Sequence, residues 1–489
     1  MLFNSIEFAF FLLIVFLIYW QLKSSGRIQN LLLLAASYVF YGWWDWRFLI
    51  LLASISTFNY LIGIKIETGR GDWHKKFYLI VGLVINLGVL GFFKYFNFFI
   101  NGFIDLVALC GYQIQGVAIK VVLPLGISFY TFLSISYILD IYKDQISAER
   151  DYPDLLLALS FFPIILAGPI QRPSSLLPQI KSARKFEYTH AVDGMRQILW
   201  GLFVKIVIAD NISPFVDQVF SNYPTLNGST LFVGALFYTI QIYADFSGYS
   251  HIAIGTASLL GFRLMQNFKT PYYARDIVDF WKRWHISLTT WFRDYLFLPV
   301  SFSISWRIKT DKVLLIRTDL FIYIIASLLT WFLTGLWHGA NYTFLIWGLL
   351  HGLMLILYRI QAKPRKRILK KLKITNDNIW LLITEGLLTF FFIVITWVIF
   401  RSESVHASFA YIQRMLSSSL FTSPGDLPLK EIVFAMLFLL AEFVKRHKSH
   451  LLQFNASDGL LIRWGIYVCL VVVILFFGGS ARQFIYFQF

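Results

Sequence analysis

The chain has 489 residues, of which 57% are apolar, 19% are aromatic and only 14% carry a formal charge. Soluble domains usually contain about 25% charged residues, so this composition excludes a disordered chain, a secreted disulfide scaffold and an ordinary soluble enzyme. The net charge of +16 would fit nucleic-acid binding, but the basic residues fall in short clusters between apolar runs, which is typical of cytoplasmic loops. We therefore expect an all-α polytopic membrane protein that contacts the lipid bilayer and no nucleic acid.

Apolar segments that suit a bilayer follow one another along the chain. Crossing the hydrocarbon core takes about 20 residues of helix, and the strong candidates lie at 6–22, 28–45, 48–64, 77–94, 314–333, 342–358, 380–400, 430–445 and 460–478. Less regular apolar stretches lie at 95–109, 118–141, 155–171, 195–216 and 229–262. Several of these contain Pro, Gly or charge, and we expect half-spans or re-entrant segments among them. The pattern predicts about 11 transmembrane helices together with re-entrant or interfacial helices.

Positive charge is concentrated in three loops. Lys23 and Arg27 follow the first segment, four basic residues lie within 65–76, and the run 359–373 contains eight basic residues and no acidic one. Because Lys and Arg favour the cytoplasmic side, these loops are predicted to face the cytoplasm and the N-terminus to face outward.

Several motifs of catalysis and metal binding are missing from the sequence. It has no H-E-x-x-H, no G-x-S-x-G, no Walker A loop and no G-x-G-x-x-G. Cys110 and Cys469 lie far apart in apolar surroundings, so we expect two buried small side chains and neither a disulfide nor a metal site.

The region 240–352 differs from the rest because polar residues interrupt its apolar background. Asp245 lies inside an apolar run, where a carboxylate is costly, so it is expected to face a cavity or a charged partner. A functional Asp and a structural Asp paired with a nearby Arg are about equally favoured by this pattern.

The segment 275–295 has the spacing of one amphipathic helix. Its apolar face would carry Trp281, Trp284, His285, Leu288, Trp291, Phe292 and Tyr295. Asp276 is placed to cap the helix, and Asp279 is placed to pair with Arg283. A lone His on such a face is more often a core residue than a functional one, so His285 stays open on this evidence.

A second histidine lies where one apolar segment ends and the next begins. His338 stands between Gly335 and Gly339, whose spacing permits close approach of two helix backbones. An intramembrane ionisable residue is a functional candidate by default, and imidazole exchanges protons near pH 7. His351 lies 13 residues further on, about 20 Å along a continuous helix, and is predicted to be structural.

Taken in order, these residues resemble the membrane-bound O-acyltransferase (MBOAT) family, in particular the bacterial branch with alginate O-acetyltransferase and the D-alanyl transferase of teichoic acids. The resemblance runs from about residue 1 to 360. It rests on the following segments: 124–130, Phe162-Pro163, 168–172, 245–250, 261–263, Asn267-Phe268, 280–288, 291–295 and 337–341. The ordered set, with two Trp-His pairs 53 residues apart, is far more specific than the Trp-His-Gly triplet alone.

The resemblance implies helices around a central funnel or tunnel, with an activated acyl donor arriving from the cytoplasm and an acceptor hydroxyl from outside. It places the core histidine at His338 and the helper histidine at His285. One departure is His251, where the alginate-type pattern has an acidic residue, and it leaves the acceptor polymer open. We expect one integral membrane acyltransferase domain over 1–489, with N-terminal spans at 1–110, a catalytic core at 111–360 and C-terminal spans at 361–489.

On this interpretation His338 is the base for the acceptor hydroxyl, and His285 orients it or binds the acyl carbonyl. Further tunnel-lining candidates are Asp245, Gln241, Trp284, Ser287, Trp337, Asn341 and Arg283. Arg283, Arg275 and Lys282 suit an anionic carrier, although a solvated charged face explains them equally well. The basic run 359–373 suits an acidic donor protein or anionic lipid, although a topological role explains it more simply.

The leading prediction is an O-acetyltransferase of the bacterial inner membrane that modifies a cell-envelope polysaccharide. No bound cofactor or metal is expected. The donor would be acetyl-CoA or a carried acyl thioester, and an extracytoplasmic acyltransferase-like or esterase-like partner would complete the transfer. The alternatives are D-alanyl or other acyl transfer to teichoic acid or another envelope acceptor and, from another class, a transporter of glycan intermediates. A transporter would show inverted repeats and a relay of acidic residues, and neither is seen.

Overall fold

The computed structural model describes residues 1–112, 121–166, 168–444, 446–454, 458–480 and 482–485. It is nearly all helical, with 74% of the residues in helices. The chain forms two compact units. Unit 1 contains residues 1–199 and 249–265, and unit 2 contains residues 200–248 and 266–489.

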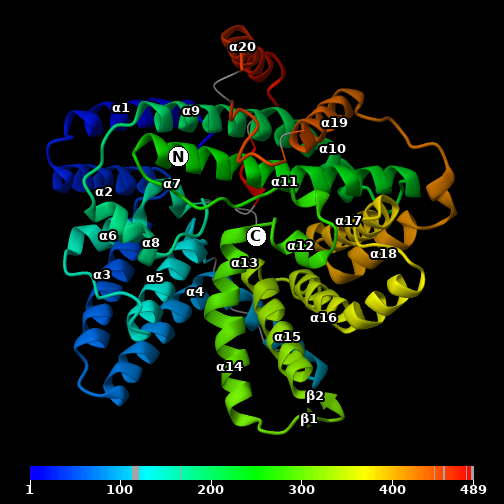
Figure 1. Cartoon of the computed structure of the whole chain (residues 1–489), viewed down its shortest axis with the longest axis horizontal. Coiled ribbons are helices and arrows are strands. Elements are labelled where there is room, and N and C mark those ends of the chain that lie inside the picture. The colour runs from blue at the N-terminus through cyan, green and yellow to red at the C-terminus, as the bar shows by residue number, and fades with distance from the viewer. Residues whose placement is uncertain (113–120, 167, 445, 455–457, 481, 486–489) are drawn as a thin grey trace. The chain divides into compact units, whose positions relative to one another are not determined.

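Unit 1 is built from the N-terminal helices. Its elements are α1 (Ile6–Gln21), α2 (Gly26–Gly42), α3 (Arg47–Thr68), α4 (Asp72–Leu109), α5 (Ile127–Tyr142), α6 (Tyr152–Ser160), α7 (Phe162–Ile165), α8 (Pro173–Lys181), most of α9 (Tyr188–Leu202) and the end of α11 (Gly228–Leu259). α3, α4 and α5 pack against one another (Figure 1). Gly126 starts α5 at φ 72°, and a Cβ there would lie 2.2 Å from the carbonyl oxygen of Ile165, so only glycine fits this junction.

Unit 2 contains the remaining elements. They are η1 (Phe203–Ala209), α10 (Asp210–Ser221), the start of α11, η2 (Pro271–Tyr273), α12 (Ile277–Trp281), α13 (Ile286–Phe292), η3 (Arg293–Phe297), α14 (Leu298–Arg307), β1 (Lys312–Val313), β2 (Ile316–Arg317), α15 (Thr318–His338), α16 (Tyr342–Lys371), α17 (Ile379–Arg401), α18 (Val405–Met415), η4 (Ser418–Phe421), α19 (Leu429–Val444) and α20 (Leu460–Phe477). The antiparallel pair β1–β2 connects α14 to α15 and pairs Lys312 with Arg317 (Figure 1).

Each of the nine strong candidate segments consists mainly of helix, although 314–333 begins in a turn and strand β2 and 430–445 ends at a residue outside the described ones. The protein spans the membrane several times. Within the described residues, seven helical segments are long and apolar enough to cross it: 47–68, 72–109, 188–221, 318–338, 342–371, 379–401 and 460–477. α1, α2 and α19 have 16 or 17 residues and fall just short of that length. The count of about 11 spans and the central funnel therefore stay predictions.

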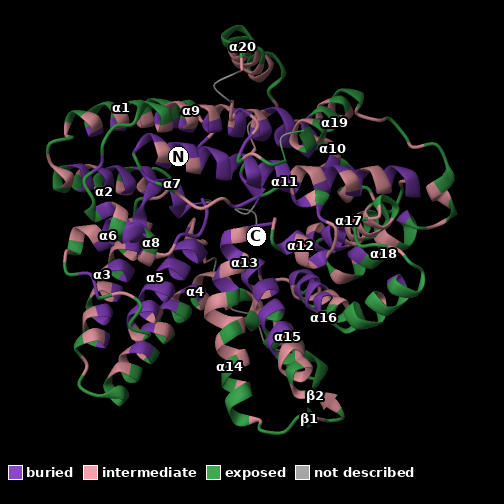
Figure 2. Cartoon of the chain, viewed as in Figure 1, coloured by how far each residue is buried: buried purple, intermediate pink, exposed green. Residues whose placement is uncertain are grey.

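The helices differ strongly in how far their residues are exposed. Figure 2 shows α5 and the middle of α11 mostly buried, and α14 and α20 mostly exposed or intermediate. The expectation that both cysteines are buried is wrong, because Cys110 and Cys469 are exposed. Cys469 lies on α20, and apolar neighbours along a sequence do not distinguish a lipid-facing helix from a core helix.

Candidate active site

His338 lies at the end of α15, at the turn that joins it to α16. Gly339 follows in an extended conformation and ends the helix, and the Asn341 side chain caps α16 by accepting a hydrogen bond of 3.1 Å from the Thr343 amide. Asn341 also donates to the carbonyl oxygen of Glu403 at 2.9 Å. Asn341 therefore has a clear structural function, and its predicted tunnel-lining role remains untested.

The close approach predicted for Gly335 is confirmed. A Cβ on Gly335 would lie 2.3 Å from the carbonyl oxygen of Phe344, and a Cβ on Gly348 would lie 2.2 Å from that of Trp331. Both distances are far below van der Waals contact, so α15 and α16 pack backbone against backbone here. This packing fixes the position of the helix end that carries His338.

Aromatic rings surround the His338 imidazole, which is only 3% exposed. Ring centroids of Trp337 and Trp347 lie 4.9 Å away, and that of Phe400 lies 5.1 Å away, all in edge-on geometry. Water is thereby kept from most of the ring, in a setting that suits chemistry on a hydrolysable substrate.

The single amphipathic helix predicted over 275–295 is wrong, although its local contacts are right. Asp276 caps α12 by accepting from the amides of Val278 and Asp279, and Asp279 pairs with Arg283 at 2.8 Å. However, α12 ends at Trp281, and α13 begins only at Ile286. The aromatic residues of the segment therefore do not share one continuous helix face.

Asn267 stabilises the break between the two helices. It lies outside the segment 275–295, so the periodicity of that segment does not reveal the break. Its backbone carbonyl accepts from the amide of Ile286 at 2.9 Å, and its side-chain oxygen accepts from the hydroxyl of Ser287 at 2.9 Å. His285 between these contacts adopts the left-handed region at φ 41°. For a non-glycine residue this conformation is uncommon, and such strain tends to gather at functional sites.

His285 is fully buried and lies against aromatic rings. Its ring centroid is 4.5 Å from that of Phe246, 6.4 Å from that of Phe268 and 6.1 Å from that of Trp337. His285 lies outside the seven candidate spans, and burial lowers its pKa to about 3 because the charged form is poorly solvated. The imidazole is therefore neutral at physiological pH. The rings of the two predicted histidines, His285 and His338, both contact the indole of Trp337, at centroid distances of 6.1 and 4.9 Å.

The other aromatic candidates join the same cluster. Trp284 is 1% exposed, and its ring centroid lies 5.0 Å from that of Trp397, which in turn stacks on Trp347 at 5.7 Å. His351 accepts a hydrogen bond of 3.3 Å from the indole of Trp281, which fits its predicted structural role. Ser287 is buried on Asn267, whereas Arg283 is half-buried beside Asp279.

Asp245 is paired with a lysine rather than with the arginine that the structural alternative proposed. Its Oδ1 lies 2.6 Å from the ammonium of Lys205, which also lies 2.7 Å from Asp210. Its Oδ2 accepts from the amide of Ile485 at 2.7 Å. Asp245 and Gln241 both line a small cavity. Its volume of about 20 Å³ suits one water molecule.

The sequence interpretation missed Lys205 and the segment 482–485. Lys205 lies five residues before Asp210 within the apolar stretch 195–216. Two opposite charges in such a stretch indicate an intramembrane ion pair. No comparable signal marked Phe484, which is fully buried with its ring centroid 5.4 Å from that of Phe246. Within the described residues, no group of three His, Cys, Asp or Glu side chains is placed to hold a metal ion.

These features define a polytopic helical membrane protein whose candidate site is a buried aromatic cluster that contains two histidines. Residues 143–405 match the family model of MBOAT, the membrane-bound O-acyltransferase family. The chain is 40% identical to the probable alginate O-acetylase AlgI of Pseudomonas aeruginosa, over 85% of this chain and 75% of that protein. It is 31% identical to the peptidoglycan O-acetyltransferase of Helicobacter pylori, over 100% of this chain and 98% of that protein.

A teichoic acid D-alanyltransferase of Bacillus subtilis is 30% identical, over 58% of this chain and 69% of that protein. The chain belongs to the MBOAT family and is an acyltransferase. The resemblance seen in the sequence is thereby confirmed.

Proposed function

We propose that the chain, in the inner membrane of a bacterium and with its N-terminus outward, moves an acetyl group from a cytoplasmic thioester donor toward hydroxyls of an extracytoplasmic envelope polysaccharide. The observation that carries this proposal is that His285 and His338 are both buried and that the rings of both contact the indole of Trp337. The names of the acetyltransferase relatives, which act on alginate and on peptidoglycan, support the acceptor class.

His338 acts as the general base in this proposal. It accepts the proton of the acceptor hydroxyl while the hydroxyl oxygen forms a bond to the thioester carbonyl carbon. The carbon–sulfur bond then breaks, and the proton passes to the leaving thiolate. His338 is the last residue of α15, where the carbonyl end of the helix favours positive charge. The imidazolium formed during transfer is stabilised there.

His285 lies at the N-terminal end of a helix, whereas His338 lies at a C-terminal end, and in this proposal His285 stays neutral during the transfer. It directly precedes α13, which continues through η3 into α14, and a helix N-terminus disfavours positive charge. A neutral imidazole in this position donates a hydrogen bond to the developing oxyanion or orients His338 without competing for its proton. Trp284, Trp337, Ser287 and Asn267 are then the residues that hold the two rings in place.

The donor is acetyl-CoA or a carried acyl thioester, and no bound cofactor takes part in this proposal. Arg275 and Arg365 share one carboxylate, that of Glu385, at 2.6 and 2.5 Å, so this group of three side chains keeps one net positive charge. Arg283 is likewise paired with Asp279. An extracytoplasmic acyltransferase-like partner completes the transfer to the polymer.

The second candidate is transfer of D-alanine to teichoic acid. The D-alanyltransferase relative aligns with 58% of the chain, whereas the peptidoglycan O-acetyltransferase aligns with all of it. The acetyl group is therefore favoured over the aminoacyl group.

The experiment measures ester-linked acetyl and D-alanine on envelope polysaccharide in cells that express the full chain. We expect His338→Ala to lower acetylation at least about 100-fold, which is the usual contribution of a general base. His406→Ala is the matched control, since His406 is an exposed histidine of α18. Equal membrane expression is checked for each variant. Wild-type acetylation with His338→Ala would refute the assignment, and loss of D-alanine instead would select the second candidate.

A further inference from the structure

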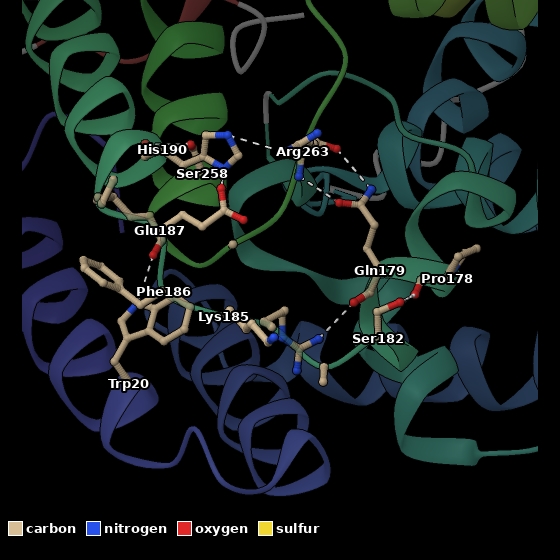
Figure 3. A pocket seen from close by; sticks show the side chains of 15 residues that line it. Trp20, Pro178, Gln179, Ser182, Lys185, Phe186, Glu187, His190, Ser258 and Arg263 are labelled. Atoms are coloured by element: carbon tan, nitrogen blue, oxygen red, sulfur yellow. Dashed lines mark hydrogen bonds and ion pairs between the residues drawn. The ribbon is translucent and has the colours of Figure 1, made fainter.

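Unit 1 contains a cavity that takes no part in the proposed chemistry. Its volume is about 580 Å³, within the size range of small-ligand sites. The lining comes from the end of α1, the segment between α8 and α9, and the residues that follow α11. Figure 3 shows the aromatic side chains of Trp20 and Phe186 on one side of the cavity and Gln179 and Ser182 on the other.

Positive charge dominates this cavity. Three cationic side chains line it, those of Arg184, Lys185 and Arg263, against one carboxylate, that of Glu187. The carboxylate of Glu187 lies 3.1 Å from the Nδ1 of His190. The Nε2 of the same imidazole lies 3.4 Å from the guanidinium of Arg263. Two cationic charges therefore remain without a balancing anion in the lining.

Two of the cations are available to a ligand. Lys185 is exposed and makes no hydrogen bond or ion pair with any residue that the structure describes. Arg263 is held through its backbone, because its amide and its carbonyl both bond the side-chain amide of Gln179, at 2.8 and 3.1 Å. Its side chain is exposed, and among the described residues its guanidinium has one hydrogen-bond partner, the Nε2 of His190.

Arg184 forms the buried wall of the site. It is 8% exposed, and its guanidinium donates to the carbonyls of Gln179 and Ile180 at 3.1 and 2.9 Å. Its Nε is buried without a hydrogen-bond partner in the described part of the chain. A buried donor left in that state is costly unless a ligand or water satisfies it.

An apolar surface adjoins the charged cavity. The ring of Phe186 is 48% exposed and packs edge-on against Phe16 of α1, at a centroid distance of 6.2 Å. The outer face of α1 continues with exposed apolar side chains, among them Leu13, Ile14 and Leu17. Trp20 ends this face with its indole fixed on the carbonyl of Leu259 at 3.1 Å, and a tryptophan in such a place is typical of the membrane–water interface.

We propose that this cavity binds the phosphate of an anionic phospholipid, with the headgroup between Lys185 and Arg263 and the acyl chains along α1. A soluble phosphate would contact the cations but not the exposed apolar face of α1 beside them. A phospholipid would contact both, because its phosphate would bind the cations and its acyl chains would cover the apolar face. Basic pockets beside transmembrane helices are known to hold anionic headgroups in this way.

The test measures binding of phosphatidylglycerol to the delipidated full chain in detergent by native mass spectrometry. Phosphatidylcholine serves as the uncharged control lipid and inorganic phosphate as the soluble probe. We expect phosphatidylglycerol to bind the wild type at least tenfold more tightly than phosphatidylcholine. Lys185→Gln should weaken it about fivefold, and Lys185→Gln with Arg263→Gln at least 20-fold, as expected for one phosphate-bound cation each. Lys76→Gln, an exposed lysine of α4, is the matched control.

Lys185→Gln removes no contact that holds the fold, so a failure to fold does not confuse the result. Unchanged phosphatidylglycerol binding by the double variant would overturn the proposal. Binding of inorganic phosphate that depends on the same two residues and displaces the lipid would also overturn it, in favour of a soluble phosphate ligand. Neither readout depends on acyl transfer, so this proposal and the proposed function fail separately.

Discussion

The packing of α15 on α16 offers a direct test of how the site is held. Substituting Gly348 by Ala places a Cβ 2.2 Å from the carbonyl oxygen of Trp331, where ordinary contact begins near 3.4 Å. The two helices must separate by about 1 Å, because a backbone oxygen cannot rotate away. Overpacking of this kind costs about 1–3 kcal/mol. A displacement of about 1 Å at the reacting groups lowers the rate about 100-fold.

The assay compares acetyl transfer and thermal unfolding of Gly348→Ala with those of Gly465→Ala. Gly465 lies on α20, where an added Cβ meets no atom within 4 Å, so this control gains helix propensity without a clash. We expect a lower melting temperature and strongly reduced transfer for the first variant only. If Gly348→Ala keeps both its melting temperature and its activity, then this helix pair does not position His338 as argued.

Three further predictions concern the second histidine and the buried ions. Asn267→Ala removes the acceptor that holds the turn at His285, and we expect a loss of about 1–3 kcal/mol in thermal unfolding together with reduced acetylation. Burial lowers the pKa of His285 from 6.5 to about 3, so the unfolded chain binds the proton more readily. This protonation of the unfolded chain has no effect above pH 6.5 and below it lowers the free energy of unfolding by about 1.4 kcal/mol per pH unit; the melting temperature of wild type should therefore fall more steeply from pH 7.5 to 5 than that of His285→Phe, and equal slopes would contradict the prediction. Lys205→Met leaves Asp245 with an uncompensated buried charge, and we expect about 3–5 kcal/mol of destabilisation by the same thermal measurement, with no such loss refuting the pairing.

The parts of the fold that the sequence predicts well are set by short-range physics. Long apolar runs identify the helices, since each must satisfy its backbone within itself when lipid surrounds it. The caps at Asp276 and the pairing of Asp279 with Arg283 also follow from residues within one turn of each other. The close approach at Gly335 was predictable because small residues four apart have few other uses in an apolar segment.

The parts that the sequence does not reveal depend on residues far apart in the chain. Asn267 breaks the helix over 275–295 from outside that segment, so no periodicity within 275–295 signals the break. The ion pair of Asp245 joins it to Lys205, 40 residues earlier, and its second oxygen binds Ile485, 240 residues later. The cavity beside Trp20 likewise assembles side chains from three separated segments of unit 1.

The buried ions of unit 2 connect stability to the geometry of the histidines. A buried ion pair contributes little net stability, because desolvation offsets most of the attraction, yet it specifies one arrangement of its neighbours. Here Lys205 pairs with Asp245, and the ring of the next residue, Phe246, lies 4.5 Å from the ring of His285. The ring of Phe484 also packs on Phe246, at 5.4 Å, and the amide of the next residue, Ile485, donates a hydrogen bond to Asp245. A shift of Asp245 is therefore transmitted to the wall of the His285 pocket, so Lys205→Met should lower acyl transfer beyond the fraction of protein that unfolds.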